Sequence, residues 1–190
     1  MKKRLLDCIH ENIKVISSTQ KHEKIIQKII TLTTKKLSQG GKILLCGNGG
    51  SAADAQHLAA EFLVRLNPKK NRKAIPAISL ATDTSTITAC GNDYNFDKIF
   101  QRTFEALFNK NDILIALTTS GKSKNILNVL KSAKKNKIPT IGFLGNKGGI
   151  AKNYCDLSII VNSSNVARIQ ESHIFLGHYI FDQIENKLFT

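Results

Sequence analysis

Cysteine is scarce in this 190-residue sequence, and the four cysteines are far apart. They are Cys8, Cys46, Cys90 and Cys155. This spacing forms neither a paired metal-ligand pattern nor a disulfide framework, so we expect reduced thiols. The sequence also lacks any run approaching the ~18 apolar residues that a membrane-spanning helix needs, and no apolar signal region follows its basic start. We therefore expect a cytoplasmic protein with no membrane segment.

Acidic residues are also few, because 14 Asp and Glu face 28 Lys and Arg, which gives a net charge of +14. A net positive charge of this size favours binding to nucleic acid, to an acidic membrane surface or to a small anionic substrate. The lysines fall in scattered pairs such as Lys35-Lys36 and Lys134-Lys135, and no cluster of aromatic residues is interleaved with them. We therefore expect a solvated basic surface rather than a nucleic-acid groove.

The length and the hydrophobic fraction of 42% suit one globular domain that spans residues 1–190. Apolar residues recur at helical spacing over residues 3–17 and 23–37, which predicts two leading helices within residues 1–38. We expect these helices to pack on the core or on a neighbouring subunit.

Short apolar runs then alternate with helical segments along the rest of the chain. Strands are predicted at residues 42–46, 76–80, 112–117, 139–144 and 157–161. Helices are predicted to start at residues 52, 82–84, 124 and 166, with the last running to about residue 187, and residues 67–73 are predicted to be a surface loop. This alternation predicts an α/β fold, a doubly wound sheet of about five parallel strands with helices on both faces.

Two loops stand where an apolar strand ends and a helix begins. Residues 47–51 (Gly-Asn-Gly-Gly-Ser) supply glycines and a hydroxyl, and residues 118–123 (Thr-Thr-Ser-Gly-Lys-Ser) supply four hydroxyls. Ligands of open α/β sheets bind at the carboxyl ends of strands, where a helix N-terminus favours an anion. The alternative is that both loops are ordinary helix caps and tight turns. Neither loop has the spacing of a dinucleotide or Walker fingerprint, which favours a phosphosugar.

Polar residues on two helices are candidates for chemistry. His57 and Glu61 are four residues apart and share a helix face, although a solvent-facing hydrogen bond would explain the same spacing. The closing helix holds Gln170 and His178 among apolar residues, and His178 could equally be a core or interface histidine. Gln170 and His178 are about 12 Å apart along an ideal helix, so a shared ligand needs long reaches, a helix irregularity or different subunits.

Several of these segments together resemble the phosphoheptose isomerases of the sugar isomerase (SIS) domain family. The similarity runs from the leading helices to the last helix and rests on residues 45–61, 91–94, 119–123 and 167–171, with His173 and His178. It implies conversion of sedoheptulose 7-phosphate to D-glycero-D-manno-heptose 7-phosphate, the first step toward activated heptose for lipopolysaccharide core or other surface glycans. It also implies a homotetramer with sites at the subunit interfaces and one zinc ion per subunit.

The resemblance also implies roles for individual residues. The zinc ligands would be His57, Glu61, Gln170 and His178. Glu61 and His178 would be the catalytic pair. Substrate would be bound by Asn48, Gly49, Gly50, Ser51, Glu61, Asn92, Asp93, Thr118, Thr119, Ser120, Ser123 and Gln170.

Two alternatives remain at this point. A branch of the same family associates with the bacterial replication initiator and lacks the glutamate that corresponds to Glu61, so the presence of Glu61 favours an enzyme. The other alternative is an isomerase of a different phosphosugar, which a substrate panel would distinguish.

Overall fold

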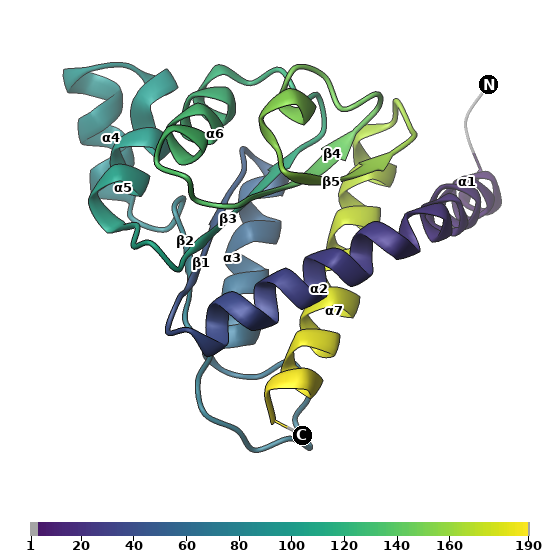
Figure 1. The fold of residues 1–190 in the computed structure, drawn as a ribbon. Coiled ribbons are helices and arrows are strands. Elements are labelled where there is room, and N and C mark those ends of the chain that lie inside the picture. Colours follow the sequence, from purple (N-terminus) through teal and green to yellow (C-terminus); the bar gives the residue numbers. More distant parts are fainter. Residues whose placement is uncertain (1–3, 190) are drawn as a thin grey trace.

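Five parallel strands form the centre of the structure, a computed structural model that describes residues 4–189 (Figure 1). The strands are β1 (Ile43–Cys46), β2 (Ala77–Ser79), β3 (Ile113–Thr118), β4 (Thr140–Gly145) and β5 (Leu157–Val161). Their order in the sheet is β2-β1-β3-β4-β5, and every neighbouring pair is parallel. The predicted fold class is confirmed, and each predicted strand matches an observed one within about one residue.

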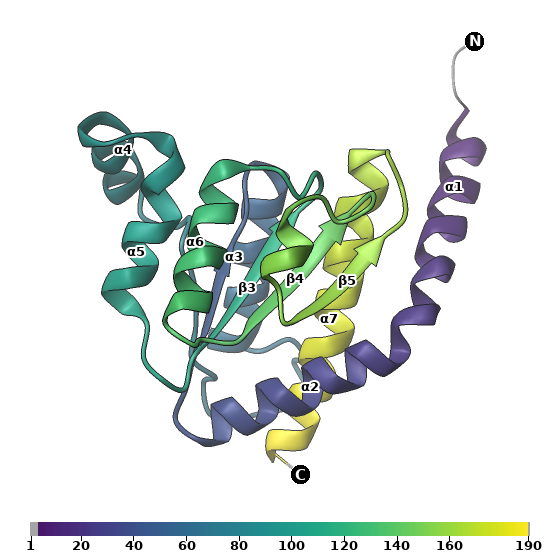
Figure 2. The same ribbon diagram turned by 45° about the horizontal axis from the view of Figure 1, so that its top comes forward.

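Successive strand residues point to opposite faces of the sheet, and each face carries its own helices and apolar core. On one face, α2 (Glu23–Ser38), α3 (Gly50–Leu63) and α7 (Val166–Phe189) pack against alternate residues such as Leu45, Ile115 and Phe143. On the other face, α4 (Thr84–Asp93), α5 (Ile99–Leu107) and α6 (Lys124–Lys135) cover Leu44 and Ala116. Figures 1 and 2 show this three-layer arrangement.

The first helix, α1 (Leu5–Ser17), projects from the body of the molecule (Figure 2). A short 3-10 helix, η1 (Ser18–His22), joins it to α2. Arg168 of α7 donates a hydrogen bond to the carbonyl of Cys8 at 3.0 Å and pairs with Glu171, whose carboxylate accepts from Asn12 at 2.5 Å. Only α2 therefore packs broadly on the core, whereas α1 contacts α7 along one side. Residues 1–3, where the first predicted helix begins, and residue 190 lie outside the described residues.

Within residues 4–189, three short elements besides η1 do not follow from the apolar pattern. They are α5 and the 3-10 helices η2 (Phe96–Lys98) and η3 (Ala151–Tyr154). The surface-loop prediction for residues 67–73 holds for most of the segment but is wrong for Arg72, whose side chain is only 2% exposed because it pairs with Glu185. Within residues 4–189, no helix combines the length and apolar character needed to cross a membrane.

Candidate active site

The two loops identified from the sequence lie side by side at the carboxyl edge of the sheet. After β1 the chain adds β2 on one side of β1, and it then adds β3 on the other side. The order therefore reverses between β1 and β3, which is the position where open α/β sheets bind ligands. Residues 47–49 leave β1 and residues 119–123 leave β3, so both loops border this position.

The first loop turns sharply into α3. Gly49 has a φ of +57°, a conformation that side chains disfavour, and its carbonyl accepts hydrogen bonds from Ala52 and Ala53 as the helix begins. Gly50 lies close to Gln170 of α7, because a Cβ at Gly50 would be 2.4 Å from the Gln170 Nε2 and the Gln170 side chain would have to move. Gly49 and Gly50 are exposed, whereas Ser51 is buried, so the loop presents backbone rather than the Ser51 hydroxyl.

The second loop exposes some of its hydroxyls and uses others internally. Thr118 is buried, and its hydroxyl accepts from the Gly121 N–H at 3.2 Å. Ser120 is exposed and its hydroxyl accepts from the Lys122 N–H at 3.2 Å, while Thr119 and Ser123 are half-buried. Ser123 makes no side-chain cap to α6. Ser120, Thr119 and Ser123 can therefore meet a ligand at the start of α6, and Thr118 shapes the loop that holds them.

A reciprocal amide pair joins the two loops. The Asn48 side chain donates to Asn125 at 2.9 Å, and the Asn125 side chain donates back at 2.8 Å. Asn125 is buried in the first turn of α6 and also accepts from the Ile126 N–H. Sequence reasoning missed Asn125, because only the fold brings it to Asn48. The Asn48 amide, expected to bind substrate, is thus engaged in holding the loops together.

Three of the predicted site residues converge between α3 and α7. The Nε2 atoms of His57 and His178 are 2.8 Å apart, and His57 Nε2 lies 3.2 Å from Glu61 Oε1. One donor atom from each of the three residues falls within 4.8 Å of the others. The His57 side chain is half exposed and that of Glu61 is 17% exposed, so the group opens to the surface.

Close packing of the two helices brings these residues together. Gly177, next to His178, lies so near Leu58 that a Cβ on it would be 2.7 Å from both Leu58 δ-carbons. Phe62, next to Glu61, stacks on Phe181 with ring centroids 3.9 Å apart. The residues that bring the helices into contact therefore adjoin the residues that face the site.

Burial and charge shift the pKa values of His178 and of the nearby Asp54. Partial burial, followed by the charge of His57, lowers the pKa of His178 below its ordinary value, and Glu61 opposes this in part. The neutral ring of His178 is thus favoured near pH 7. One turn before His57, burial raises the pKa of Asp54 to about 6, against the attraction of His57.

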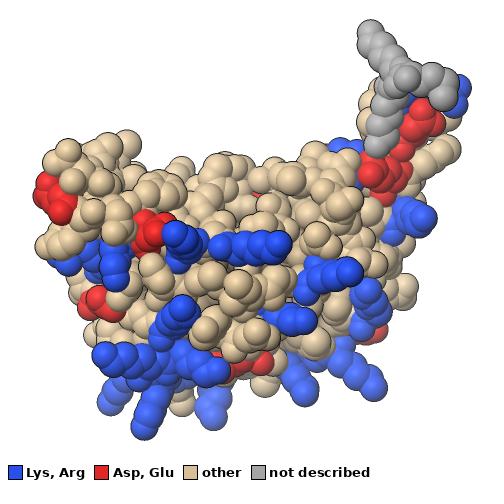
Figure 3. Space-filling model, turned by 90° about the horizontal axis from the view of Figure 1, so that it is seen from above, with Lys and Arg blue, Asp and Glu red and all other residues tan. Residues whose placement is uncertain are grey.

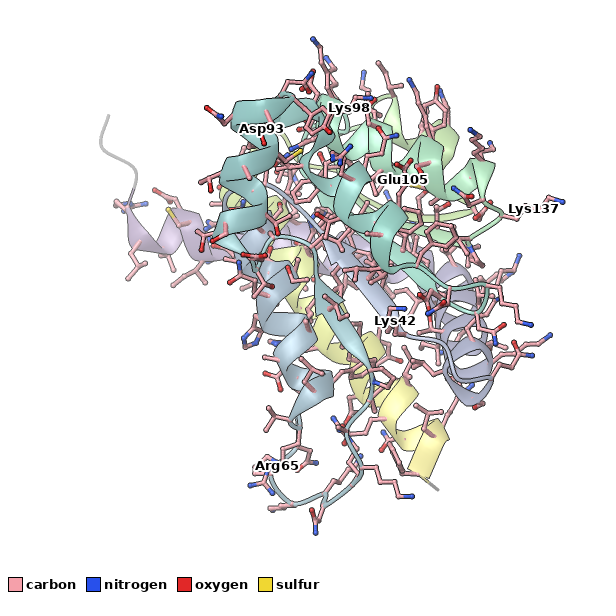
Figure 4. The ribbon with its side chains drawn as sticks, turned by 90° about the vertical axis from the view of Figure 1, so that its left-hand side faces the viewer. Lys42, Arg65, Asp93, Lys98, Glu105 and Lys137 are labelled. Carbon is pink, nitrogen blue, oxygen red and sulfur yellow. The ribbon has the colours of Figure 1, made fainter. Side chains whose placement is uncertain are left out.

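The remaining predicted residues lie apart from this group. Gln170 lies against Gly50, which precedes His57 by two helical turns, or about 10 Å. Asn92 and Asp93 are exposed on α4, where Asn92 donates to Asp93 at 2.9 Å. Asp93 borders a hollow of about 600 Å³ that neither loop lines. Figure 4 shows Asp93 at the far end of the molecule from Arg65.

On the face seen in Figure 3, the basic side chains of the described residues are scattered rather than gathered in one strip. Figure 3 shows Lys and Arg spread over the face seen from above, most densely along its lower edge, with uncharged surface between them. The scattered basic surface expected from the sequence agrees with this view.

The donor atoms of His57, Glu61 and His178 suit a metal ion. Two imidazole nitrogens and a carboxylate oxygen are a ligand set that zinc takes in catalytic sites, where a fourth position stays open. The chain's own residues thus fit the ion implied by the resemblance.

Comparison with known proteins shows which family and which solved structures this chain is similar to. The SIS domain family model matches residues 7–145. A phosphoheptose isomerase of Clostridium acetobutylicum is 48% identical over 93% of this chain and 88% of the relative, and one of Campylobacter concisus is 53% identical over 78% of each chain. The solved phosphoheptose isomerase of Neisseria gonorrhoeae superposes with a TM-score of 0.90 at 36% identity, covering 96% of this chain and 97% of that one.

Proposed function

Because this chain belongs to the SIS domain family and, within it, to the phosphoheptose isomerases, we propose that it converts sedoheptulose 7-phosphate to D-glycero-D-manno-heptose 7-phosphate. The observation that carries this proposal is the convergence of His57, Glu61 and His178 between α7 and α3, the helix that starts at the first strand-end loop. The product would supply activated heptose for lipopolysaccharide core or other surface glycans.

Ketose-to-aldose conversion moves a proton between C1 and C2 through an enediol, so it needs a base for the carbon proton and an acid for the oxygens. Glu61 is the base in our proposal, because it supplies the carboxylate of the group, 3.2 Å from His57 Nε2, and its side chain is still 17% exposed. His178 is the acid, and its lowered pKa keeps the ring neutral so that it donates an N–H to a substrate oxygen.

The substrate phosphate would bind at the start of α6. Ser120, Thr119 and Ser123 offer hydroxyls there, and the helix N-terminus offers backbone N–H groups and a positive dipole end. The exposed backbone of Gly49 and Gly50 would face the sugar, while the Asn48–Asn125 pair keeps both loops in register.

His57, Glu61 and His178 would hold one zinc ion per subunit. When bound, zinc would polarise the substrate carbonyl and stabilise negative charge on the enediolate. Gln170, the fourth expected ligand, can join this group by leaving Gly50 or from a neighbouring subunit, and we propose the second route.

A homotetramer with shared sites is part of the same proposal. Apolar residues of α1 are exposed, and α7 exposes Phe175 and Tyr179 beside a hollow of about 420 Å³. Such surfaces suit a second copy of the chain. Asn92 and Asp93, which are exposed on α4, would then reach substrate held by a neighbour. We also propose that the chain acts as one SIS domain in the cytoplasm, which its four free cysteines support.

The test is proton exchange in heavy water with purified protein and sedoheptulose 7-phosphate, followed by NMR. We expect wild type to form the aldose and to exchange the C1 proton. Glu61→Gln keeps the size of the side chain but cannot accept a proton, so exchange should fall by at least ~10²-fold.

Glu105→Gln is the matched control. Glu105 accepts hydrogen bonds from Gln101 and Ser132 on the opposite face of the sheet, and a glutamine oxygen can accept them too. The control should exchange normally. Near-normal exchange in Glu61→Gln would show that Glu61 is not the base. Conversion of a different phosphosugar in preference to the heptulose would overturn the assignment of the substrate.

A further inference from the structure

Arg72 is a buried arginine in the loop that follows α3. Its Nε donates to Glu185 Oε2 at 2.6 Å, and the two side chains are only 2% and 1% exposed. A charge so far from water persists only with a close partner and further hydrogen bonds. The surroundings of Arg72 therefore indicate a specific structural task.

Arg72 donates hydrogen bonds to carbonyls at the C-terminal end of α3. The last carbonyls of a helix have no partner within the helix, and the last turn of α3 contains no basic residue. Arg72 supplies donors there: Nη2 donates to the Glu61 carbonyl at 2.8 Å, and Nη1 donates at 2.9 Å to the Phe62 carbonyl, which also accepts from the Ile75 N–H. The guanidinium thus holds the backbone of the residue that we propose as the base.

The partner of Arg72 belongs to the other helix of the site. Glu185 lies on α7, seven residues and about two turns after His178. Arg72 therefore connects the backbone of Glu61 on α3 to the helix that carries His178. The Phe62–Phe181 stack lies on the same stretch of the two helices.

We propose that Arg72, acting through Glu185, is a positioning residue that fixes Glu61 relative to His178. The inference rests on the proposed function, since it concerns the same acid and base. Arg72 lies at the end of α3 opposite the loops, because Gly50 and Glu61 are eleven residues, or about 16 Å, apart along the helix. Its loss should therefore change turnover and leave phosphate binding intact.

The test compares Arg72→Met with the double variant Arg72→Met/Glu185→Leu. The single variant leaves Glu185 buried without its cation, so it should unfold at a lower temperature than wild type. The double variant replaces the ion pair with apolar side chains, which commonly restores stability. It does not restore the hydrogen bonds to the Glu61 and Phe62 carbonyls. We expect kcat of the folded double variant to stay ~10- to 100-fold low with KM within about 2-fold, because small misplacements of reacting groups cost that much.

Two controls make the result specific. Lys42→Met breaks another buried pair, Lys42 with Asp112 at 2.6 Å, at the amino-terminal edge of the sheet (Lys42 is labelled in Figure 4). It should lower stability without changing kcat per folded molecule. Arg72→Lys keeps the charge but not the planar set of donors, so its kcat should lie between those of wild type and Arg72→Met.

The outcomes separate the two proposals. Wild-type kcat in the folded double variant, with Glu61→Gln inactive, would overturn the positioning role of Arg72 and leave the isomerase proposal standing. Normal exchange in Glu61→Gln would instead overturn the assignment of the base. A rise in KM as large as the fall in kcat would also contradict our inference, because it would place the effect at the phosphate.

Discussion

His57, His173 and His178 are the same residue type in three environments. His57 is half exposed, and His178 is partly buried with a lowered pKa. His173 is fully buried with its ring 6.0 Å from that of Phe143, and burial lowers its pKa to about 4 although the Leu144 carbonyl opposes this. His173 belongs to the core, and the two other histidines face the site.

The buried His173 makes stability depend on pH. Above about pH 6.5 the ring is neutral in both the folded and the unfolded chain. As pH falls from 6.5 toward 4, the unfolded chain binds a proton that the folded chain excludes, so the free energy of unfolding falls, by up to about 3 kcal/mol for a shift from 6.5 to about 4. Urea unfolding of His173→Leu should show a weaker pH dependence than wild type in this range.

His10→Gln is the control for this measurement, because His10 is exposed on α1 and should leave the pH dependence unchanged. An unaltered slope in His173→Leu would show that other groups cause the acid sensitivity.

Residue spacing predicted part of the site but not all of it. The strand-end loops and the His57–Glu61 pair follow from local patterns, and the structure brings His178 to that pair. Arg72 and Asn125 could not be found in this way, because their partners lie 113 and 77 residues away in sequence. A lysine-rich segment is typical of a surface loop, and no local signal marks its one buried arginine.

Among the elements, the strands were the most predictable, because each is a short apolar run that ends in a turn. The helix α5 was missed since it is only nine residues long and its N-cap makes no side-chain hydrogen bond. Its buried residues, Ile99, Phe100 and Phe104, become recognisable as one face only once they pack under α6.

The contact between α3 and α7 depends on Gly177. In Gly177→Ala the new methyl group would overlap the Leu58 δ-carbons, so we expect a net loss of about 1 kcal/mol of stability and lower activity, since His178 is the next residue. Leu58→Val should recover part of both losses in the double variant. Thermal unfolding and the isomerase assay would measure the two effects.

Gly91→Ala is the matched helix control, because a Cβ at Gly91 would have no heavy atom within 4 Å. It should stabilise the protein by up to about 1 kcal/mol, since alanine favours helix more than glycine does. If Gly177→Ala were equally stabilising, the contact between α3 and α7 would not require a glycine at position 177.

At the scale of the whole molecule, α1 stands out because its apolar side chains are exposed in the single chain. Leu5, Leu6, Ile9 and Ile13 are 77%, 52%, 44% and 56% exposed. An apolar stripe of this kind on a projecting helix is typical of a helix that packs against a partner.

We therefore expect Ile9→Asp/Ile13→Asp to shift the protein from oligomer to smaller species in light scattering. Activity should fall with it, because the proposed site takes residues from neighbouring subunits. Lys14→Ala, on an exposed position of the same helix, is the control and should keep the wild-type mass. A fully active monomer would contradict shared sites.

The position of α7 in the chain also limits when activity can arise during synthesis. His57 and His178 are separated by 121 residues, and Glu185 follows later still. Ribosomes add about 5–20 residues per second, so His178 is synthesised roughly 6–24 s after His57. A nascent chain can complete β1, α3 and their turn in that interval, but the proposed site still lacks His178. In our proposal, catalysis is therefore acquired late in translation, after most of the sheet has had time to form.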